Sequence, residues 1–278
     1  MNELNTSSLE KRKAIKLNYE DYGEGQPIIL IHGWPLSHKM WEYQIQALVN
    51  SGYRVIAYDR RGFGDSSKPW NGYDYDTLAR DLKDIIETLK LKNVVLVGFS
   101  MGGGEVSRYI KNYSSSSISK AILVSAVTPY MLNTSDNDAV DISTFEGMKE
   151  GIIKDRPAFF KDFGKNFFNY DDLKESRISN AMLDFTWGLA MEASLKATLD
   201  CVDSFGKTDF REDCKAFDIP TLIIHGNQDQ IVPIDVSAQK ASQLIPNSTF
   251  KIINDAPHGL MVTHHQELNS LLLDFLKQ

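Results

Sequence analysis

Short runs of apolar, often β-branched residues alternate along the chain with longer segments whose apolar residues recur at helical spacing. A short continuous apolar run predicts a buried strand, and apolar residues three or four positions apart predict an amphipathic helix. The expected strands cover residues 13–22, 27–31, 54–58, 93–97, 120–125, 221–225 and 249–253. The expected helices cover residues 77–89, 101–113, 235–244 and 265–277. This alternation predicts an α/β fold with a mostly parallel central sheet flanked by helices, in which the 13–22 strand lies at the edge.

The alternation stops between residues 128 and 216, where helical blocks rich in aromatic residues replace the strands. These aromatic residues are Phe145, Phe159, Phe160, Phe163, Phe167, Phe168, Phe185 and Trp187. We expect most of them to form the core of the insert, and about a third to face a cleft. Because the strands resume afterwards, we predict one core made of residues 1–127 and 217–278, with 128–216 inserted as a helical lid.

Composition and charge narrow the classes of protein to which the chain can belong. Its 278 residues are 42% hydrophobic and 24% charged, which suffices for one large core with an insert. A net charge of −7 without a basic cluster argues against nucleic acid as a partner. The first residues, MNELNTSSLEKRK, lack the apolar stretch of a signal peptide, and no apolar run approaches the roughly 18 residues of a membrane span. We therefore expect a cytoplasmic protein that does not contact a membrane.

The two cysteines, Cys201 and Cys214, fit a reducing compartment. No motif beside either of them would lower the pKa of the thiol. We therefore expect free structural thiols and no cysteine nucleophile.

The pentapeptide Gly98-Phe99-Ser100-Met101-Gly102 joins a predicted strand to a predicted helix. In that position a G-x-S-x-G sequence forms a sharp turn that exposes the serine above the sheet. Gly98 and Gly102 allow close backbone approach where a Cβ would collide. The helix N-terminus places partial positive charge beside the serine, which favours a developing oxyanion. We therefore predict that Ser100 is a catalytic nucleophile.

A serine nucleophile needs a base, and the base needs an acid that orients it. His258 follows the last predicted strand, and Asp229 follows the strand before it. The order Ser, Asp, His is typical of α/β hydrolases. Asp255 is the rival acid, but its place three residues before the histidine favours a role in shaping the loop.

The oxyanion hole is expected to combine two backbone N–H groups. One comes from Met101, the residue after the nucleophile, and one from the loop that follows the 27–31 strand. In the loop sequence His32-Gly33-Trp34-Pro35 the donor is Trp34, since Pro35 has no N–H.

Several other polar residues favour structural roles. We expect His32 to hold its loop, and Arg60 or Arg61 to tie neighbouring loops together. The pair His264-His265 resembles a metal site, but neighbours on a helix point to different faces. A solvated helix start is the better interpretation of that pair.

Longer motifs then point to one family: HGWP, YDRRGFGDSSKPW, DYDT, LVGFSMGGGEVSRYI, LVSAVTP, SLKATLDCVDSFGKTDFR, PTLIIHGNQDQIVP and DAPHGLMVTH. Together they resemble the cofactor-free haloperoxidases of the α/β-hydrolase superfamily, also called non-haem chloroperoxidases, bacterial arylesterases or perhydrolases. The resemblance covers the chain from about residue 16 to the C-terminus.

The resemblance implies an α/β-hydrolase fold, no cofactor and no metal, and a homo-oligomer such as a trimer or its multiples. It implies a triad of Ser100, Asp229 and His258 with oxyanion donors at Trp34 and Met101. The substrate pocket of the family corresponds here to Val127, Phe163, Phe167 and Ile231. The implied chemistry is an acyl-enzyme, formed from a small ester or lactone, that is resolved by water or by hydrogen peroxide. The peroxide route gives a peracid, which oxidises halide in solution.

Pro35 occurs in relatives named for perhydrolysis. A proline restricts the preceding residue to extended conformations, so Pro35 is expected to aim the Trp34 carbonyl at the path of the attacking nucleophile. A hydrogen bond from peroxide to that carbonyl would favour perhydrolysis.

Two other hypotheses remain open. The chain could catalyse another reaction on the same fold, as a lactonase, an amide or lactam hydrolase or a C–C bond hydrolase, or it could be a hydrolase-fold receptor for a small molecule. Dehalogenase chemistry is disfavoured, because it needs a carboxylate nucleophile where Ser100 stands.

Overall fold

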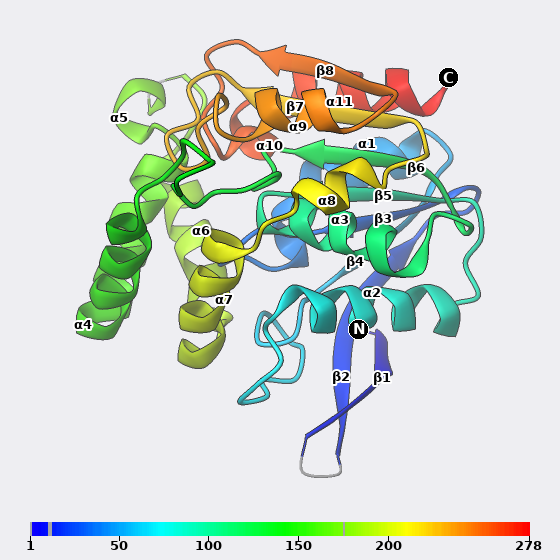
Figure 1. Ribbon diagram of the computed structural model, residues 1–278, viewed down its shortest axis with the longest axis horizontal. Coiled ribbons are helices and arrows are strands. Elements are labelled where there is room, and N and C mark those ends of the chain that lie inside the picture. Colours follow the sequence, from blue (N-terminus) through cyan, green and yellow to red (C-terminus); the bar gives the residue numbers. More distant parts are fainter. Residues whose placement is uncertain (1, 11–12, 175) are drawn as a thin grey trace.

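The computed structural model describes residues 2–10, 13–174 and 176–278. Within these residues, eight strands form one sheet in the order β1-β2-β4-β3-β5-β6-β7-β8 (Figure 1). The strands are β1 (Asn2–Glu10), β2 (Lys13–Tyr22), β3 (Pro27–Ile31), β4 (Arg54–Tyr58), β5 (Val94–Phe99), β6 (Ile118–Val124), β7 (Thr221–Gly226) and β8 (Ser248–Ile253). All neighbours from β4 to β8 are parallel, and β1 and β2 are antiparallel. The predicted mostly parallel sheet is confirmed.

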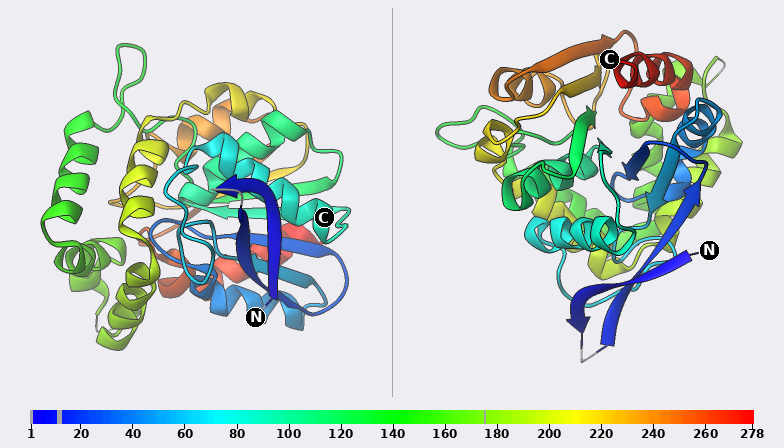
Figure 2. Two further views of the ribbon diagram at one scale, coloured as in Figure 1. Left: turned by 90° about the horizontal axis from the view of Figure 1, so that it is seen from below. Right: turned by 90° about the vertical axis from the view of Figure 1, so that its right-hand side faces the viewer.

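The edge of the sheet differs from the prediction. β1 pairs with β2 through the register Leu4↔Leu17, so β2 is an inner strand and the prediction that residues 13–22 form the edge was wrong. β1 escapes detection because only two of its residues are apolar, and one of these, Leu9, is 67% exposed. The C-terminal end of β1 and the N-terminal end of β2 project from the body of the molecule (Figure 2), while the other end of β2 pairs with β4.

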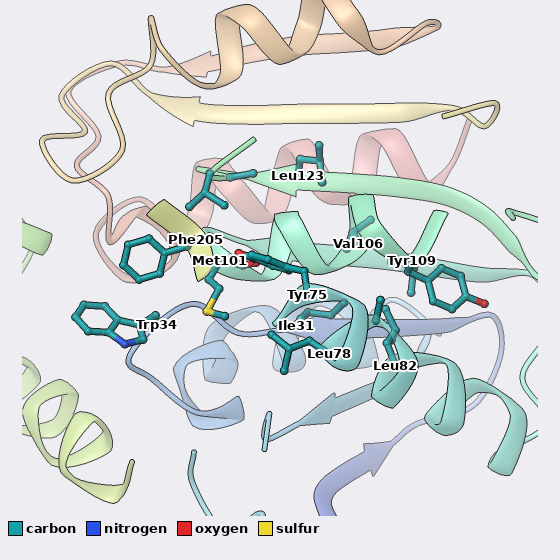
Figure 3. Close-up of a cluster of buried hydrophobic side chains, with 14 of the residues drawn as sticks. Ile31, Trp34, Tyr75, Leu78, Leu82, Met101, Val106, Tyr109, Leu123 and Phe205 are labelled. Carbon is teal, nitrogen blue, oxygen red and sulfur yellow. The ribbon is translucent and has the colours of Figure 1, made fainter. Parts of the chain in front are cut away.

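Helices cover both faces of the sheet. One face carries α2 (Tyr75–Thr88), α3 (Met101–Tyr113) and α9 (Ala238–Leu244), and the other carries α1 (Glu42–Asn50), α10 (Leu260–Thr263) and α11 (His265–Leu276). A short 3-10 helix, η1 (His38–Trp41), precedes α1. Side chains from α2 and α3 pack on β3 and β6 in the buried cluster of Figure 3, among them Leu78, Leu82, Val106, Ile31 and Leu123. This packing fixes α3, and with it the residue that precedes the helix, relative to the sheet.

The chain between β6 and β7 forms α4 (Ile142–Phe167), α5 (Tyr170–Leu173), α6 (Asn180–Glu192), α7 (Leu195–Lys207) and α8 (Arg211–Lys215). The described residues of this segment add no strand to the sheet. α4 is kinked at Asp155, two residues before Pro157, because a proline cannot donate the backbone hydrogen bond of a continuous helix. α4, α6 and α7 lie together at one end of the sheet (Figure 1).

Both cysteines are buried and free, as predicted. Cys201 lies in α7 and Cys214 in α8. Burial raises the pKa of the Cys201 thiol to about 12, which keeps it protonated at neutral pH. In the part of the chain that the structure describes, every helix is too short or too polar to cross a membrane.

Candidate active site

Ser100 occupies the sharp turn between β5 and α3. Its φ of 53° lies in the left-handed region, which a non-glycine residue adopts only when its surroundings enforce it. A Cβ on Gly98 would collide with the Gly102 carbonyl group, and a Cβ on Gly102 would lie 2.5 Å from the Ile31 carbonyl oxygen. Glycine at both positions is therefore a steric requirement of this turn.

The next two glycines serve the packing of α3. A Cβ on Gly103 would collide with the side chain of Ala126, just after β6, as expected for a helix that lies close to the strands. A Cβ on Gly104 would instead meet two rings, Phe210 at 2.6 Å and Tyr75 at 2.8 Å. Gly104 therefore makes room for aromatic side chains and not for a strand.

The structure brings Ser100, His258 and Asp229 into one chain of hydrogen bonds. Ser100 Oγ lies 2.9 Å from His258 Nε2, and His258 Nδ1 lies 2.6 Å from Asp229 Oδ2. The carboxylate only accepts, so Nδ1 carries the proton and Nε2 is free to accept from the serine hydroxyl. Asp255 is exposed, and its backbone N–H donates to the Asn227 side chain at 2.7 Å. Of the two candidate acids, Asp229 is therefore the one hydrogen-bonded to His258.

The Asp229 carboxylate is buried and held on both oxygens. Its Oδ1 accepts from the N–H of Ile231 at 2.9 Å and from the N–H of Val232 at 2.8 Å. Burial alone would raise the pKa of this carboxyl, but the neighbouring His258 and His225 imidazoles and their hydrogen bonds hold the pKa below its usual range. Asp229 therefore stays ionised throughout the neutral pH range.

The two residues expected to supply the oxyanion donors, Met101 and Trp34, belong to segments that adjoin Ser100. Met101 is the first residue of α3, so its N–H is one of those that have no partner within the helix. The loop that carries Trp34 packs on the nucleophile, since a Cβ on Gly33 would lie 3.1 Å from the Ser100 Cβ. The side chains of Met101 and Trp34 belong to the buried cluster (Figure 3).

The Trp34 indole is anchored in the helices between β6 and β7. Its Nε1–H donates to the Thr198 carbonyl of α7 at 3.1 Å. Its ring centroid lies 5.3–5.5 Å from three phenylalanine rings of α4 and α7, which are Phe160, Phe163 and Phe205. These helices therefore directly hold Trp34, a residue of the loop that follows β3.

A buried network beneath the site holds the same loop from the other side. The Arg60 N–H donates to His32 Nε2 at 2.9 Å, and its guanidinium donates to the His32 carbonyl at 2.8 Å and to Glu105 of α3 at 2.9 Å. Arg61 forms a second buried ion pair, with Asp81 of α2. His32 thus has the predicted structural position, and both arginines tie loops to helices.

A cavity of about 340 Å³ opens at Ser100 and His258. Of the residues expected around the substrate, Val127, Phe163 and Ile231 line it, together with Trp34. Further lining residues come mainly from α4 and the segment before it: Phe145, one of the aromatic residues of which about a third were expected to face a cleft, and Met131, Val140, Thr144 and Met148. Most of this wall is apolar, which suits small acyl or aryl groups.

Pro35 and Phe167 lie outside the lining of this cavity. Pro35 packs in a small hollow against Phe160 and Phe163. Phe167 stands edge-on to the His258 ring, with the ring centroids 5.1 Å apart. The structure therefore places Phe167 against the His258 ring and outside the cavity.

His264 and His265 do not form a solvated helix start. His264 is 2% exposed, and its Nδ1 lies 2.9 Å from the Thr263 hydroxyl, so the expectation of solvation was wrong for this residue. His265 is half-buried and stacks on Tyr43, with ring centroids 4.4 Å apart. Both rings are packed because the short helix α10 turns the chain back onto α1 before α11 begins. No group of three or more His, Cys, Asp or Glu side chains among the described residues could hold a metal ion.

His225, at the end of β7, is a neighbour of the triad that the sequence analysis did not single out. Its Nε2 lies 3.1 Å from Asp229 Oδ2 and 2.8 Å from the Val232 carbonyl oxygen. The signal available in the sequence was the spacing His225-Gly226-Asn227-Gln228-Asp229, which places a histidine at the strand end four residues before the acid.

Comparisons with known proteins agree with this geometry. The family model described as alpha/beta hydrolase fold matches residues 26–265. The chain is 41% identical over 270 residues to the non-haem chloroperoxidase CPO-A1 of Kitasatospora aureofaciens, covering 96% of this chain and 98% of that protein. It is 34% identical over 269 residues to the bifunctional esterase/perhydrolase of Acinetobacter calcoaceticus, covering 96% and 98%. The crystal structure of bromoperoxidase from Bacillus anthracis has a TM-score of 0.93 at 50% identity and covers 96% of this chain and 97% of that chain. This chain is thus a member of the alpha/beta hydrolase fold family and, within it, of the non-haem chloroperoxidases.

Proposed function

We propose that this protein is a serine carboxylic-ester hydrolase that forms an acyl-enzyme and transfers the acyl group to water or to hydrogen peroxide. The observation that carries the proposal is the hydrogen-bonded chain Ser100–His258–Asp229 at the floor of an apolar cavity. The esterase and perhydrolase activities named for the Acinetobacter calcoaceticus relative agree with it.

In the first half-reaction Ser100 Oγ attacks the ester carbonyl carbon while His258 Nε2 takes the hydroxyl proton. The Met101 and Trp34 N–H groups then donate to the oxyanion of the tetrahedral intermediate. Collapse of this intermediate breaks the bond to the alcohol or phenol, which leaves with the proton from His258. The acyl group then remains on Ser100.

In the second half-reaction His258 removes a proton from the incoming water or hydrogen peroxide. Attack by water releases a carboxylic acid, and attack by hydrogen peroxide releases a peracid. The peracid transfers one oxygen to a halide ion in solution and returns to the carboxylic acid. Haloperoxidase activity then follows from acyl transfer, with segment 128–216 acting as the lid over the acyl site.

A substrate panel tests the proposal. Wild-type protein is incubated with aryl acetates, lactones and lactams, each with and without hydrogen peroxide, and acid, peracid and halogenation of a dye are measured. We expect multiple turnover of aryl acetates, and peracid only when peroxide is present. Mass spectrometry of the protein, quenched during turnover, should show one acyl group on Ser100. A single turnover without release of acid would instead favour a receptor.

Replacing Pro35 by leucine should lower the ratio of perhydrolysis to hydrolysis. Leucine relaxes the restriction on Trp34, so its carbonyl loses the orientation proposed to accept a hydrogen bond from peroxide. The ratio of peracid to acid from one aryl acetate, at fixed peroxide, measures the effect. If the variant hydrolyses the ester normally and the ratio is unchanged, Pro35 has no role in perhydrolysis.

A further inference from the structure

His225 is a fully buried titratable residue that touches the triad and has no role in the reaction steps above. It is the last but one residue of β7, a strand paired on both sides, by β6 and β8. The side chain is 0% exposed. Its backbone is therefore fixed by the sheet, and its ring lies beside the loop that carries Asp229.

The ring nitrogen that faces Asp229 must be a hydrogen-bond donor. His225 Nε2 lies 2.8 Å from the Val232 carbonyl oxygen, which can only accept, so Nε2 carries the proton. The same nitrogen lies 3.1 Å from Asp229 Oδ2, the oxygen that also accepts from His258. The Nε2–H group of His225 is thus directed at the Val232 carbonyl, with Asp229 Oδ2 close beside it.

His225 is connected to both oxygens of the Asp229 carboxylate, to one directly and to the other through Val232. Val232, whose carbonyl accepts from His225, also donates its own N–H to Asp229 Oδ1 at 2.8 Å. Val232 therefore links the histidine to one carboxylate oxygen, and Nε2 approaches the other oxygen directly. A rotation of the carboxylate about its last side-chain bond would have to break contacts on both oxygens.

The same strand end holds the loop of the catalytic base. A Cβ on Gly226 would collide with the Ala256 carbonyl, and the Gln228 N–H donates to that carbonyl at 3.0 Å. His225 thus lies at the end of β7, where the loop that carries Asp229 begins and the loop that carries His258 packs.

We propose that His225 is a positioning residue for ester hydrolysis: its Nε2–H fixes the plane of the Asp229 carboxylate and keeps Oδ2 within hydrogen-bond distance of His258. It acts through Asp229 and never touches the substrate. The inference rests on the proposed esterase mechanism, since it concerns the orientation of the same triad.

Three variants at this position test the inference with 4-nitrophenyl acetate as the probe. His225→Leu removes the donor and should lower kcat by about 10- to 100-fold, with KM within about threefold of wild type, because the substrate cavity stays in place. His225→Gln can place its amide N–H near the position of Nε2 and should recover most of the lost kcat. His225→Asn, whose amide ends near the position of Nδ1, should not.

A second background separates positioning from a general loss of stability. In Asp229→Ala protein there is no carboxylate to orient, so adding His225→Leu should lower the residual kcat no further. His264→Gln serves as the matched control, since it alters a buried histidine away from the triad and should lower the melting temperature without changing kcat. Equal losses from His225→Leu in both backgrounds, or equal activity of the Leu and Gln variants, would overturn the inference.

Failure of this inference can be told apart from failure of the proposed mechanism. If wild type does not hydrolyse the ester, or Ser100→Ala still does, the esterase mechanism itself is wrong. If wild type is active, Ser100→Ala is inactive and His225→Leu keeps wild-type kcat, only the role of His225 is refuted.

Discussion

Replacing Ser100 by alanine should lower kcat for 4-nitrophenyl acetate by about 10⁴- to 10⁶-fold, the range found when the nucleophile of a serine hydrolase is removed. The loss is large because Oγ is the atom that forms the acyl-enzyme, and the described geometry places no other hydroxyl in contact with His258 Nε2. Acyl transfer to water and to peroxide should disappear together, since both use the same intermediate.

The fold should survive this change. Alanine, like serine, has a Cβ, so the φ of 53° remains as it was, and only one hydrogen bond to His258 is lost. Ser107→Ala is the matched control, because Ser107 is a buried serine of α3, the helix that follows Ser100, and its hydroxyl donates to the Gly103 carbonyl at 2.9 Å. Its kcat should stay within about twofold of wild type. Retention of more than a few per cent of turnover by Ser100→Ala would refute the acyl-enzyme mechanism.

Replacing Asp229 by asparagine should lower kcat by about 10³- to 10⁴-fold. The two loop N–H groups that now bind Oδ1 will keep selecting the amide oxygen, because an NH₂ group cannot accept from them. The amide NH₂ then faces His258 Nδ1, and as a donor it stabilises the tautomer whose Nε2 carries a proton. Such an imidazole cannot accept the proton of Ser100.

The matched control for this variant is Asp255→Asn, which makes the same chemical change at the exposed acid three residues before His258. Its kcat should stay within about twofold of wild type. Steady-state kinetics of both variants decide between the two acids. A large loss in Asp255→Asn, with little change in Asp229→Asn, would assign the orienting role to Asp255.

The central sheet and the nucleophile turn could be predicted because their signals are local. Parallel strands buried on both faces give continuous apolar runs, and the predicted bounds of β3, β4 and α3 agree with the structure residue for residue. β1 has no continuous apolar run. It is a strand because it pairs with β2, and its composition gives no sign of this.

The parts of the site that sequence could not predict depend on tertiary packing. Val140 and Thr144 line the cavity only because the chain after β6 folds over Ser100, and no motif marks them. Phe167 illustrates the same limit: this aromatic residue of α4 was expected in the substrate pocket, but it packs against His258 and does not line the cavity. His264 is buried because α10 turns the chain just before it.

The packing of the Trp34 indole against α4 and α7 has an evolutionary consequence. The backbone N–H of this residue is the proposed oxyanion donor, while its side chain is held by the Thr198 carbonyl and three phenylalanine rings of the insert. If the proposed mechanism holds, substitutions in these helices that adapt the site to a new acyl group would also move the group proposed to stabilise the transition state. Substrate range and turnover rate would then evolve as linked traits, and a graft of these helices from a relative should carry activity only if it preserves the contacts of the Trp34 indole.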